Sequence, residues 1–206
     1  MELYIVRHGE TPWNEQHLLQ GRTDIALNEN GRQLARETGI ALHDVPFDRI
    51  FSSPLQRAYE TANLILGNRR LEIQTDDRLK EISFGSYEGG DSKKLFADLT
   101  DPFHYFFSAP ELYRAPADGE SFEAVCARAA SFLKEEIEPH EKEWDRIMIT
   151  AHGALNKALL CHIKNHGIAD YWSGDLQKNC GVCIVRLENG IYQVLDECKL
   201  FYKQVS

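Results

Sequence analysis

Two histidines in this chain share one local pattern, and that pattern can support chemistry. His8 and His152 each follow a short apolar run and each precede a glycine. Such runs predict buried β-strands, and in open α/β sheets catalytic groups gather just beyond the carboxyl ends of parallel strands. Arg7 adds a rigid fork of N–H donors that matches phosphate oxygens, and Gly9 lets a substrate approach the backbone closely. The pattern therefore predicts an anion-binding site that contains two imidazoles.

Three further polar residues are expected at the same edge of the sheet. Asn14 follows the turn at Thr11-Pro12 and should swing back toward the first strand. Arg57 comes one turn into a helix that follows a strand, where its guanidinium can reach this edge. Two arginines and two histidines that converge in this way form a pocket for a dianionic phosphoryl group. Glu81, in a loop after a later strand, would bring an acid to the pocket from the side.

The elements that must position these residues alternate between strand and helix. Apolar runs rich in Ile, Val and Leu suit a sheet that is covered on both faces. They predict strands at Leu3–Arg7, Arg49–Ser52, Leu71–Thr75, Arg146–Thr150, Val182–Leu187 and Tyr192–Glu197. Helices are expected from the N-cap Asn28 to about Leu42, from Ser53-Pro54, from Ser121 to Glu138 and after Gly153, and Asn189-Gly190 predicts a hairpin.

The segment Asp91–Asp118 is the least regular part of the chain and is rich in aromatic residues and prolines. We expect it to form a helical insertion that caps the catalytic edge. Its aromatic cluster permits two interpretations, a hydrophobic plug or a lid that contacts the substrate. His104 is the histidine that this segment would bring near the site. No linker composition interrupts the chain, so we expect residues 1–206 to form one domain with an insertion at about 91–118.

Composition narrows the class of protein. A hydrophobic content of 43% and a charged content of 27% are ordinary for a globular protein. The net charge of -9 argues against nucleic acid or an anionic membrane as a partner, although a local cationic pocket can still bind a small phosphorylated substrate. No apolar run approaches the roughly 20 residues that span a bilayer, and no basic flank or cleavage-like site indicates a secretory signal.

The five cysteines do not form a disulfide framework, because their number is odd and most of them lie in apolar segments. This usage predicts a reducing, cytoplasmic setting. Cys180 and Cys183 form a lone CxxC, whereas a structural zinc site needs four ligands. We therefore expect Cys183 in a core strand and Cys180 in the preceding loop. The sequence leaves the oligomeric state open, a homodimer included.

Five short motifs follow one another along nearly the whole chain. They are Arg7-His8-Gly9-Glu10-Thr11-Pro12-Trp13-Asn14 with Gln20-Gly21, Ser52-Ser53-Pro54-Leu55-Gln56-Arg57-Ala58, Glu81-Ile82-Ser83-Phe84-Gly85-Ser86-Tyr87-Glu88-Gly89, Gly119-Glu120-Ser121 and Ala151-His152-Gly153. This ordered set resembles the histidine phosphatase (phosphoglycerate-mutase-like) superfamily. The resemblance implies a three-layer α/β/α sandwich with a mostly parallel sheet. It also implies a covalent phosphohistidine mechanism that uses no metal and no other cofactor.

The same resemblance implies a role for each matching residue. His8 would be the nucleophile, and Glu81 would protonate the leaving oxygen and then help water attack the phosphohistidine. The expected ligands of the phosphoryl oxygens are Arg7, Arg57 and His152, with Asn14 and the backbone of Gly153 beside them, while Gln20 and Gly21 would line the pocket near the rest of the substrate.

Elementary electrostatics agrees with these roles. Surrounding cations should lower the pKa of His8 and keep its attacking nitrogen unprotonated. Glu81 must supply a proton near neutral pH, so we expect it in a partly apolar setting beside Ile82 and Phe84.

Within this superfamily the residues favour removal of a phosphoryl group over its transfer to another position. Phosphoglycerate mutases resemble this chain but typically follow the catalytic glutamate with Arg-His-Tyr-Gly, whereas Glu81 is followed by Ile82-Ser83-Phe84-Gly85. Ala154 stands where the mutases have asparagine, and the insertion lacks their paired arginines. The leading hypothesis is a phosphomonoester hydrolase that acts on a small phosphorylated metabolite. A cofactor-dependent phosphoglycerate mutase is the alternative, and a non-catalytic phospho-ligand binding module is the second alternative.

Overall fold

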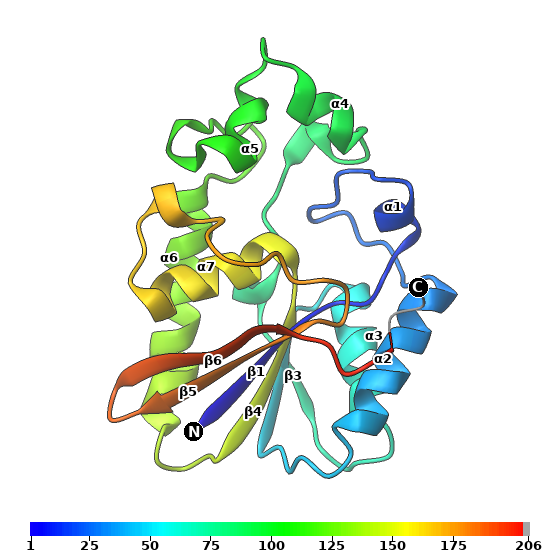
Figure 1. Cartoon of the computed structure of the whole chain (residues 1–206), viewed down its shortest axis with the longest axis vertical. Coiled ribbons are helices and arrows are strands. Elements are labelled where there is room, and N and C mark those ends of the chain that lie inside the picture. The colour runs from blue at the N-terminus through cyan, green and yellow to red at the C-terminus, as the bar shows by residue number, and fades with distance from the viewer. Residues whose placement is uncertain (204–206) are drawn as a thin grey trace.

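The computed structural model describes residues 1–203, and it contains one six-stranded sheet of order β3-β2-β4-β1-β5-β6. The strands are β1 (Glu2–Arg7), β2 (Arg49–Ser52), β3 (Ile73–Thr75), β4 (Arg146–Ala151), β5 (Val182–Glu188) and β6 (Ile191–Lys199). The four strands β1 to β4 pair in parallel, and β5 and β6 form an antiparallel hairpin against β1 (Figure 1). The expected mostly parallel sheet is confirmed.

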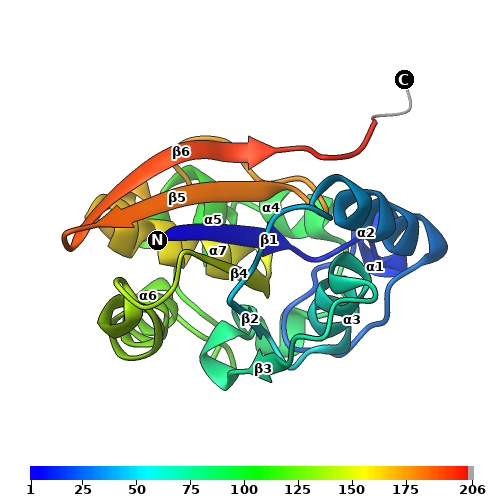
Figure 2. The same cartoon turned by 90° about the horizontal axis from the view of Figure 1, so that it is seen from below.

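Helices cover both faces of this sheet, as Figure 2 shows. One face carries α2 (Glu29–Ala41) and α3 (Gln56–Leu66), and the other carries α6 (Phe122–Phe132) and α7 (Gly153–Lys164). Two separate hydrophobic clusters fill the two spaces between helices and sheet. The three-layer α/β/α sandwich that the resemblance implies is therefore present.

The central strands are buried on both faces, which explains their unbroken apolar sequence. Ile5 of β1 lies between Ile149 of β4 and Cys183 of β5, and all three side chains are fully buried. A fully buried aliphatic side chain contributes about 1.5–3 kcal/mol through the hydrophobic effect. The core thus fixes the register of β1 against β4, and that register decides where the two strands end.

Most helix boundaries follow their predicted caps. The Asn28 side chain accepts a hydrogen bond from the Gly31 backbone N–H, and the Ser121 side chain accepts one from Ala124. The last helix begins at Gly153, and α6 continues as a π-helical turn over Leu133–Ile137. These contacts satisfy backbone donors that helix starts leave unpaired.

The predicted start of α3 at Ser53-Pro54 is wrong. The helix begins at Gln56, after the N-cap Leu55, so Arg57 is its second residue. The Ser53 hydroxyl accepts a hydrogen bond from the Leu55 N–H at 3.3 Å and also contacts His152 at 2.8 Å. Because His152 also holds the Ser53 side chain, Ser53 closes a short turn before α3 and does not cap the helix. The strand predicted over Leu71–Thr75 is likewise shorter and begins at Ile73.

The insertion lies at the top of Figure 1, above the edge where β1 and β4 end. It contains α4 (Ser92–Ala97) and α5 (Tyr105–Ser108), and a third short helix, α1 (Pro12–Glu15), follows β1. Phe103, Phe106 and Tyr113 are buried within it. The remaining single-turn helices are Asp77–Leu79, Gly85–Tyr87, Pro102–His104, Pro110–Leu112, Glu138–His140 and Ile168–Asp170.

Two further expectations concern the cysteines and the membrane. All five cysteines are free thiols, with Cys183 buried in β5 and Cys180 in the loop before it, as the CxxC interpretation expects. Among residues 1–203, no helix is both long and apolar enough to cross a bilayer.

Close packing of α2 on α3 makes a testable prediction at Gly39. A Cβ added there would lie 2.8 Å from the carbonyl oxygen of Ile65, which is backbone and cannot move aside cheaply. Replacing glycine by alanine within a helix stabilises the helix by about 1 kcal/mol, whereas overpacking destabilises a protein by about 1–3 kcal/mol. We therefore expect Gly39→Ala to lower the free energy of unfolding, by up to about 2 kcal/mol, in urea denaturation. Ile40→Ala is the control, because this neighbouring side chain is 76% exposed, and equal stability of the two variants would contradict the prediction.

Candidate active site

The site forms where β1 and β4 end side by side. Arg7 is paired with Ala151 in the parallel ladder, so the next residues, His8 and His152, leave the sheet together. Their ring centroids are 5.2 Å apart, and both side chains are buried. The His8 N–H donates to the Ala151 carbonyl at 2.9 Å, which holds the two strand ends together. Register alone therefore brings the two histidines of the sequence pattern into one site.

The hydrogen bonds of His8 leave one ring nitrogen free to react. Its Nδ1 lies 2.7 Å from the Gly9 carbonyl oxygen, which can only accept, so Nδ1 carries the proton. Burial, followed by the charges of Arg57 and Arg7, holds the pKa of His8 well below its usual range. The neutral ring therefore has its lone pair on Nε2. This agrees with the expectation that nearby cations keep His8 unprotonated.

The second imidazole has the opposite arrangement. Nε2 of His152 lies 2.8 Å from the Ser53 hydroxyl. That hydroxyl already accepts from the Leu55 N–H, so its own proton is available for Nε2. Burial and the charge of Arg57 keep the pKa of His152 well below its usual range. The neutral ring then carries its proton on Nδ1, a buried atom with no hydrogen-bond partner.

Two arginines bring positive charge to this site, each anchored by carbonyl oxygens. Arg57 is completely buried and donates from its terminal nitrogens to the carbonyls of Gly21 at 2.6 Å and Thr23 at 3.0 Å. Arg7 donates to the Gln177 carbonyl at 2.6 Å. Burial lowers the pKa of Arg57 to about 10 and also lowers the pKa of Arg7. The Nε atoms of both arginines are buried without a partner.

Glu81 reaches the site at the N-terminus of α7. Its carboxylate accepts from the backbone N–H groups of Ala154 at 3.1 Å, Leu155 at 2.9 Å and Ile82 at 2.9 Å. The carboxyl group is only 6% exposed, and the adjacent Ile82 and Phe84 are buried. Glu81 therefore has the expected apolar neighbours, but its carboxylate also accepts hydrogen bonds from the backbone of α7, which the sequence pattern did not indicate.

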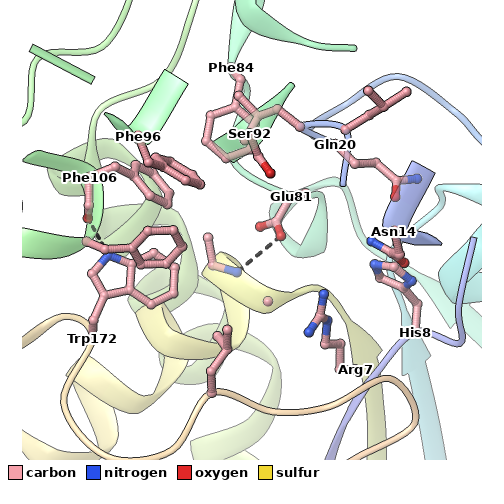
Figure 3. Close-up of a pocket in the computed structure, with 16 residues that line it drawn as sticks. Arg7, His8, Asn14, Gln20, Glu81, Phe84, Ser92, Phe96, Phe106 and Trp172 are labelled. Carbon is pink, nitrogen blue, oxygen red and sulfur yellow. Dashed lines mark hydrogen bonds between the residues drawn. The ribbon is translucent and has the colours of Figure 1, made fainter. Parts of the chain in front are cut away.

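A cavity of about 170 Å³ opens onto these groups, with Arg7 and His8 in its wall and Glu81 between them and an aromatic side (Figure 3). Asn14, Gln20 and Gly153 line it as expected, and Gln20 Nε2 is a further buried donor without a partner. Arg57 and His152 lie outside the lining. Gly21 was predicted to line the pocket, and this is wrong: its carbonyl holds Arg57, and a Cβ there would lie 2.2 Å from Glu88.

The aromatic insertion both fills the core and lines the cavity. Phe103 and Tyr113 are buried away from the cavity, whereas Phe96, Phe106 and Phe107 belong to its wall. The two interpretations of this cluster are therefore not exclusive. His104 does not line the cavity, because its ring nitrogen lies 2.6 Å from the Asp101 carbonyl.

Several residues that shape the site carry no signal in the sequence pattern. Asn179 donates to the His8 carbonyl at 3.1 Å and to the Asn14 side chain at 3.3 Å, and Trp172 lines the cavity. Thr61 accepts from the Gly9 N–H at 2.9 Å. Their contacts span up to 171 residues of sequence, so no local periodicity could reveal them. Ser53 lies within a recognised motif, but its contact with His152 became visible only in three dimensions.

Among the described residues, no group of His, Cys, Asp or Glu side chains could hold a metal ion. The arrangement instead offers a neutral imidazole with a free Nε2, a carboxylate across the cavity, and several buried N–H groups. Such a set can attack an electrophile and stabilise negative charge on its oxygens.

The buried histidines predict how stability depends on pH. Below about pH 6.5 both histidines take up protons in the unfolded chain while the folded protein holds them neutral. Unfolding then binds protons, so the free energy of unfolding should fall as pH falls below this value, by up to about 1.4 kcal/mol per pH unit for each histidine. We expect His8→Asn to reduce this slope in urea titrations between pH 7 and pH 5. The exposed control His17→Asn should retain it, and an unchanged slope in His8→Asn would refute the assignment.

Comparison with known proteins agrees with this geometry. Residues 3–197 match the family described as "Histidine phosphatase superfamily (branch 1)". The chain is 32% identical over 186 residues to "Putative phosphoserine phosphatase 2" of Hydrogenobacter thermophilus, covering 90% of this chain and 89% of that protein. It is 31% identical to a 2,3-bisphosphoglycerate-dependent phosphoglycerate mutase of Cytophaga hutchinsonii, covering 84% and 82%. The structure of Bacillus stearothermophilus YhfR superposes with a TM-score of 0.88 at 33% identity, covering 98% and 99% of the two chains. The chain belongs to branch 1 of the histidine phosphatase superfamily.

Proposed function

We propose that this protein is a phosphomonoester hydrolase that acts through a phosphohistidine on His8. The observation that carries the proposal is the set of unpartnered buried donors. Among the described residues, seven buried polar side-chain atoms lack a partner, and four are N–H groups of Arg7, Gln20, Arg57 and His152. An unmade hydrogen bond on a buried group costs about 1–3 kcal/mol. Arg7 and Gln20 line the cavity and His152 lies beside His8, so these unpaired donors indicate a missing ligand. A phosphoryl group offers the oxygens that these donors need.

The first chemical step transfers the phosphoryl group to the enzyme. Nε2 of His8 attacks phosphorus and forms an N–P bond as the P–O bond to the leaving group breaks. Glu81 gives its proton to the leaving oxygen as this bond breaks. Arg7, Arg57 and His152 stabilise the charge on the transferred oxygens, which is the main demand of phosphoryl transfer.

The second step returns the enzyme to its starting state. Glu81, now a carboxylate, takes a proton from a water molecule that attacks phosphorus. The N–P bond breaks, Nε2 regains its lone pair, and inorganic phosphate leaves. Asn14 and the backbone at Gly153 lie beside this path.

A phosphoglycerate mutase is the second candidate, favoured by relatives that carry this name. A mutase must hold the carboxylate of its substrate and keep water from the phosphohistidine. Among the described residues, Arg7 is the one cationic side chain in the cavity wall, since the His8 ring is neutral, and it is already needed for the phosphoryl group. The relatives named as phosphatases support hydrolysis of a small phosphorylated compound.

His8 gives the most direct test of the mechanism. We expect His8→Ala to abolish phosphate release from p-nitrophenyl phosphate by metal-free protein, because no other group replaces its Nε2. Wild-type protein quenched during turnover of a ³²P-labelled ester should carry a label that is stable to alkali and lost in acid. His162→Ala is the matched control, because His162 lies on α7 away from the cavity. Phosphate release at the wild-type rate by His8→Ala would reject the mechanism.

Glu81 provides a second, independent prediction. We expect Glu81→Gln to lower kcat/KM, which reports transfer of the phosphoryl group to His8, by roughly 10²–10⁴ for an alkyl phosphate, whose leaving oxygen needs a proton. The loss should be much smaller for p-nitrophenyl phosphate, because its phenolate leaves unprotonated. The exposed control Glu15→Gln should change neither rate. An equal loss for both esters would show that Glu81 does not act as the acid.

A further inference from the structure

The cavity beyond the phosphoryl site has two chemically distinct sides (Figure 3). The groups that would bind the phosphoryl oxygens gather near His8. The opposite side carries Phe84, Phe96, Phe106 and Trp172, with Phe107 packed against Phe96 and Trp172, and Leu176 is a further apolar residue of the lining. Glu81 lies between the two sides, where the leaving oxygen would be. Whatever is attached to that oxygen must therefore project toward the aromatic side.

Polar donors on the aromatic side are already engaged. The Trp172 indole N–H donates to the Phe106 carbonyl at 2.5 Å, so the ring offers the substrate only its carbon atoms. Ser92 is the one hydroxyl-bearing side chain in the lining, and it donates to the His17 carbonyl at 2.8 Å. Neither group has a proton left for a carboxylate or hydroxyl of the substrate.

Cations are also missing from this side. Three basic residues close in sequence to lining residues have other partners: Arg22 pairs with Glu120, Lys94 with Asp91, and the buried Lys157 donates to the Ser173 carbonyl at 2.6 Å. None of these three lines the cavity. A second anionic group on the substrate would lose its hydration without gaining a counter-ion, which is costly. A substrate carboxylate or second phosphate is therefore disfavoured.

The apolar side chains that border the cavity remain accessible to an apolar ligand. Phe107 is 43% exposed and Leu176 is 51% exposed, although both border the cavity. Phe107 lies 4.6 Å from Trp172 and 4.8 Å from Phe96 between ring centroids, so the wall is a continuous aromatic surface. Exposed apolar groups around a pocket typically mark a ligand site.

The size of the cavity limits the ligand further. An apolar cavity of about 150 Å³ holds one benzene molecule. The cavity here has about 170 Å³ and also opens to solvent, so it accommodates a phosphoryl group with one ring or a short chain. Building on the proposed function, we infer that the preferred substrates are monoesters whose alcohol is aromatic or aliphatic and carries no second anionic group, and that Trp172, Phe107 and Leu176 determine this preference.

Steady-state kinetics on esters of similar leaving groups test the inference. The metal-free protein is assayed with 2-phenylethyl phosphate, ethyl phosphate, O-phosphoserine and 3-phosphoglycerate, all of which release an alkoxide-type oxygen. We expect kcat/KM for 2-phenylethyl phosphate to exceed that for ethyl phosphate by roughly 10-fold or more, because burial of the ring lowers KM. It should exceed the values for both carboxylate-bearing esters by about 100-fold.

Variants of the residues that line the cavity distinguish a loss of substrate contact from a loss of the folded structure. Trp172→Ala and Phe107→Ala should each lower kcat/KM for 2-phenylethyl phosphate by about 5–10-fold and change it by less than 2-fold for ethyl phosphate. Leu112→Ala is the control, because this exposed leucine lies in the insertion but outside the cavity. Leu176→Arg should weaken the preference by raising kcat/KM for the two carboxylate-bearing esters by at least 5-fold. If Trp172→Ala unfolds the protein, the exposed Phe107 and Leu176 variants still decide the question.

Two different failures can be told apart. Hydrolysis of all four esters at similar rates, or a preference for phosphoserine, would overturn the substrate class and leave the hydrolase function intact. Equal losses on both alkyl esters in the Phe107 variant would also overturn it. No phosphate release from any ester would reject the proposed function itself.

Discussion

The site depends on two guanidinium groups held inside the fold largely by neutral oxygens. Desolvation of Arg7 and Arg57 disfavours their charge, and within residues 1–203 no carboxylate forms an ion pair with either. Carbonyls of Gly21, Thr23 and Gln177 compensate part of this cost, and the charge of Glu81 opposes it from a distance. A buried charge without a full partner destabilises the protein. Binding of an anion at this site would therefore be favourable, because it supplies the missing partner.

Burial and the same positive charge together govern the imidazoles. Both lower the pKa of His8 and of His152 and keep the rings neutral, while one hydrogen bond, at Nδ1 of His8 and at Nε2 of His152, selects the tautomer. The result is one ring with a free lone pair and one with a free N–H. A nucleophile and a donor therefore arise from the same side-chain type, because Gly9 offers a carbonyl and Ser53 offers a hydroxyl.

The two ends of the cavity are built by different parts of the chain. The polar end comes from strand ends and the first turn of α7, whose positions are set by the packed sheet. The apolar end comes from the insertion and from the loop that carries Trp172 and Leu176. This division places the common chemistry on the rigid scaffold and the selection of the leaving group on loops, where side chains can change without disturbing the core.

Patterns among neighbouring residues of the sequence predicted much of this structure. Apolar runs and caps placed the strands and most helices, since burial on both faces and unpaired helix donors leave signatures in neighbouring residues. The motif order also placed His8, Arg57 and His152 near one another, because the two histidines follow directly on strand ends and Arg57 lies in the first turn of the helix after β2. Only the tertiary structure decided the start of α3, the role of Gly21, the polar setting of Glu81 and the aromatic wall completed by Trp172. Those features depend on contacts between segments far apart in the chain, and such contacts leave no trace in the spacing of nearby residues.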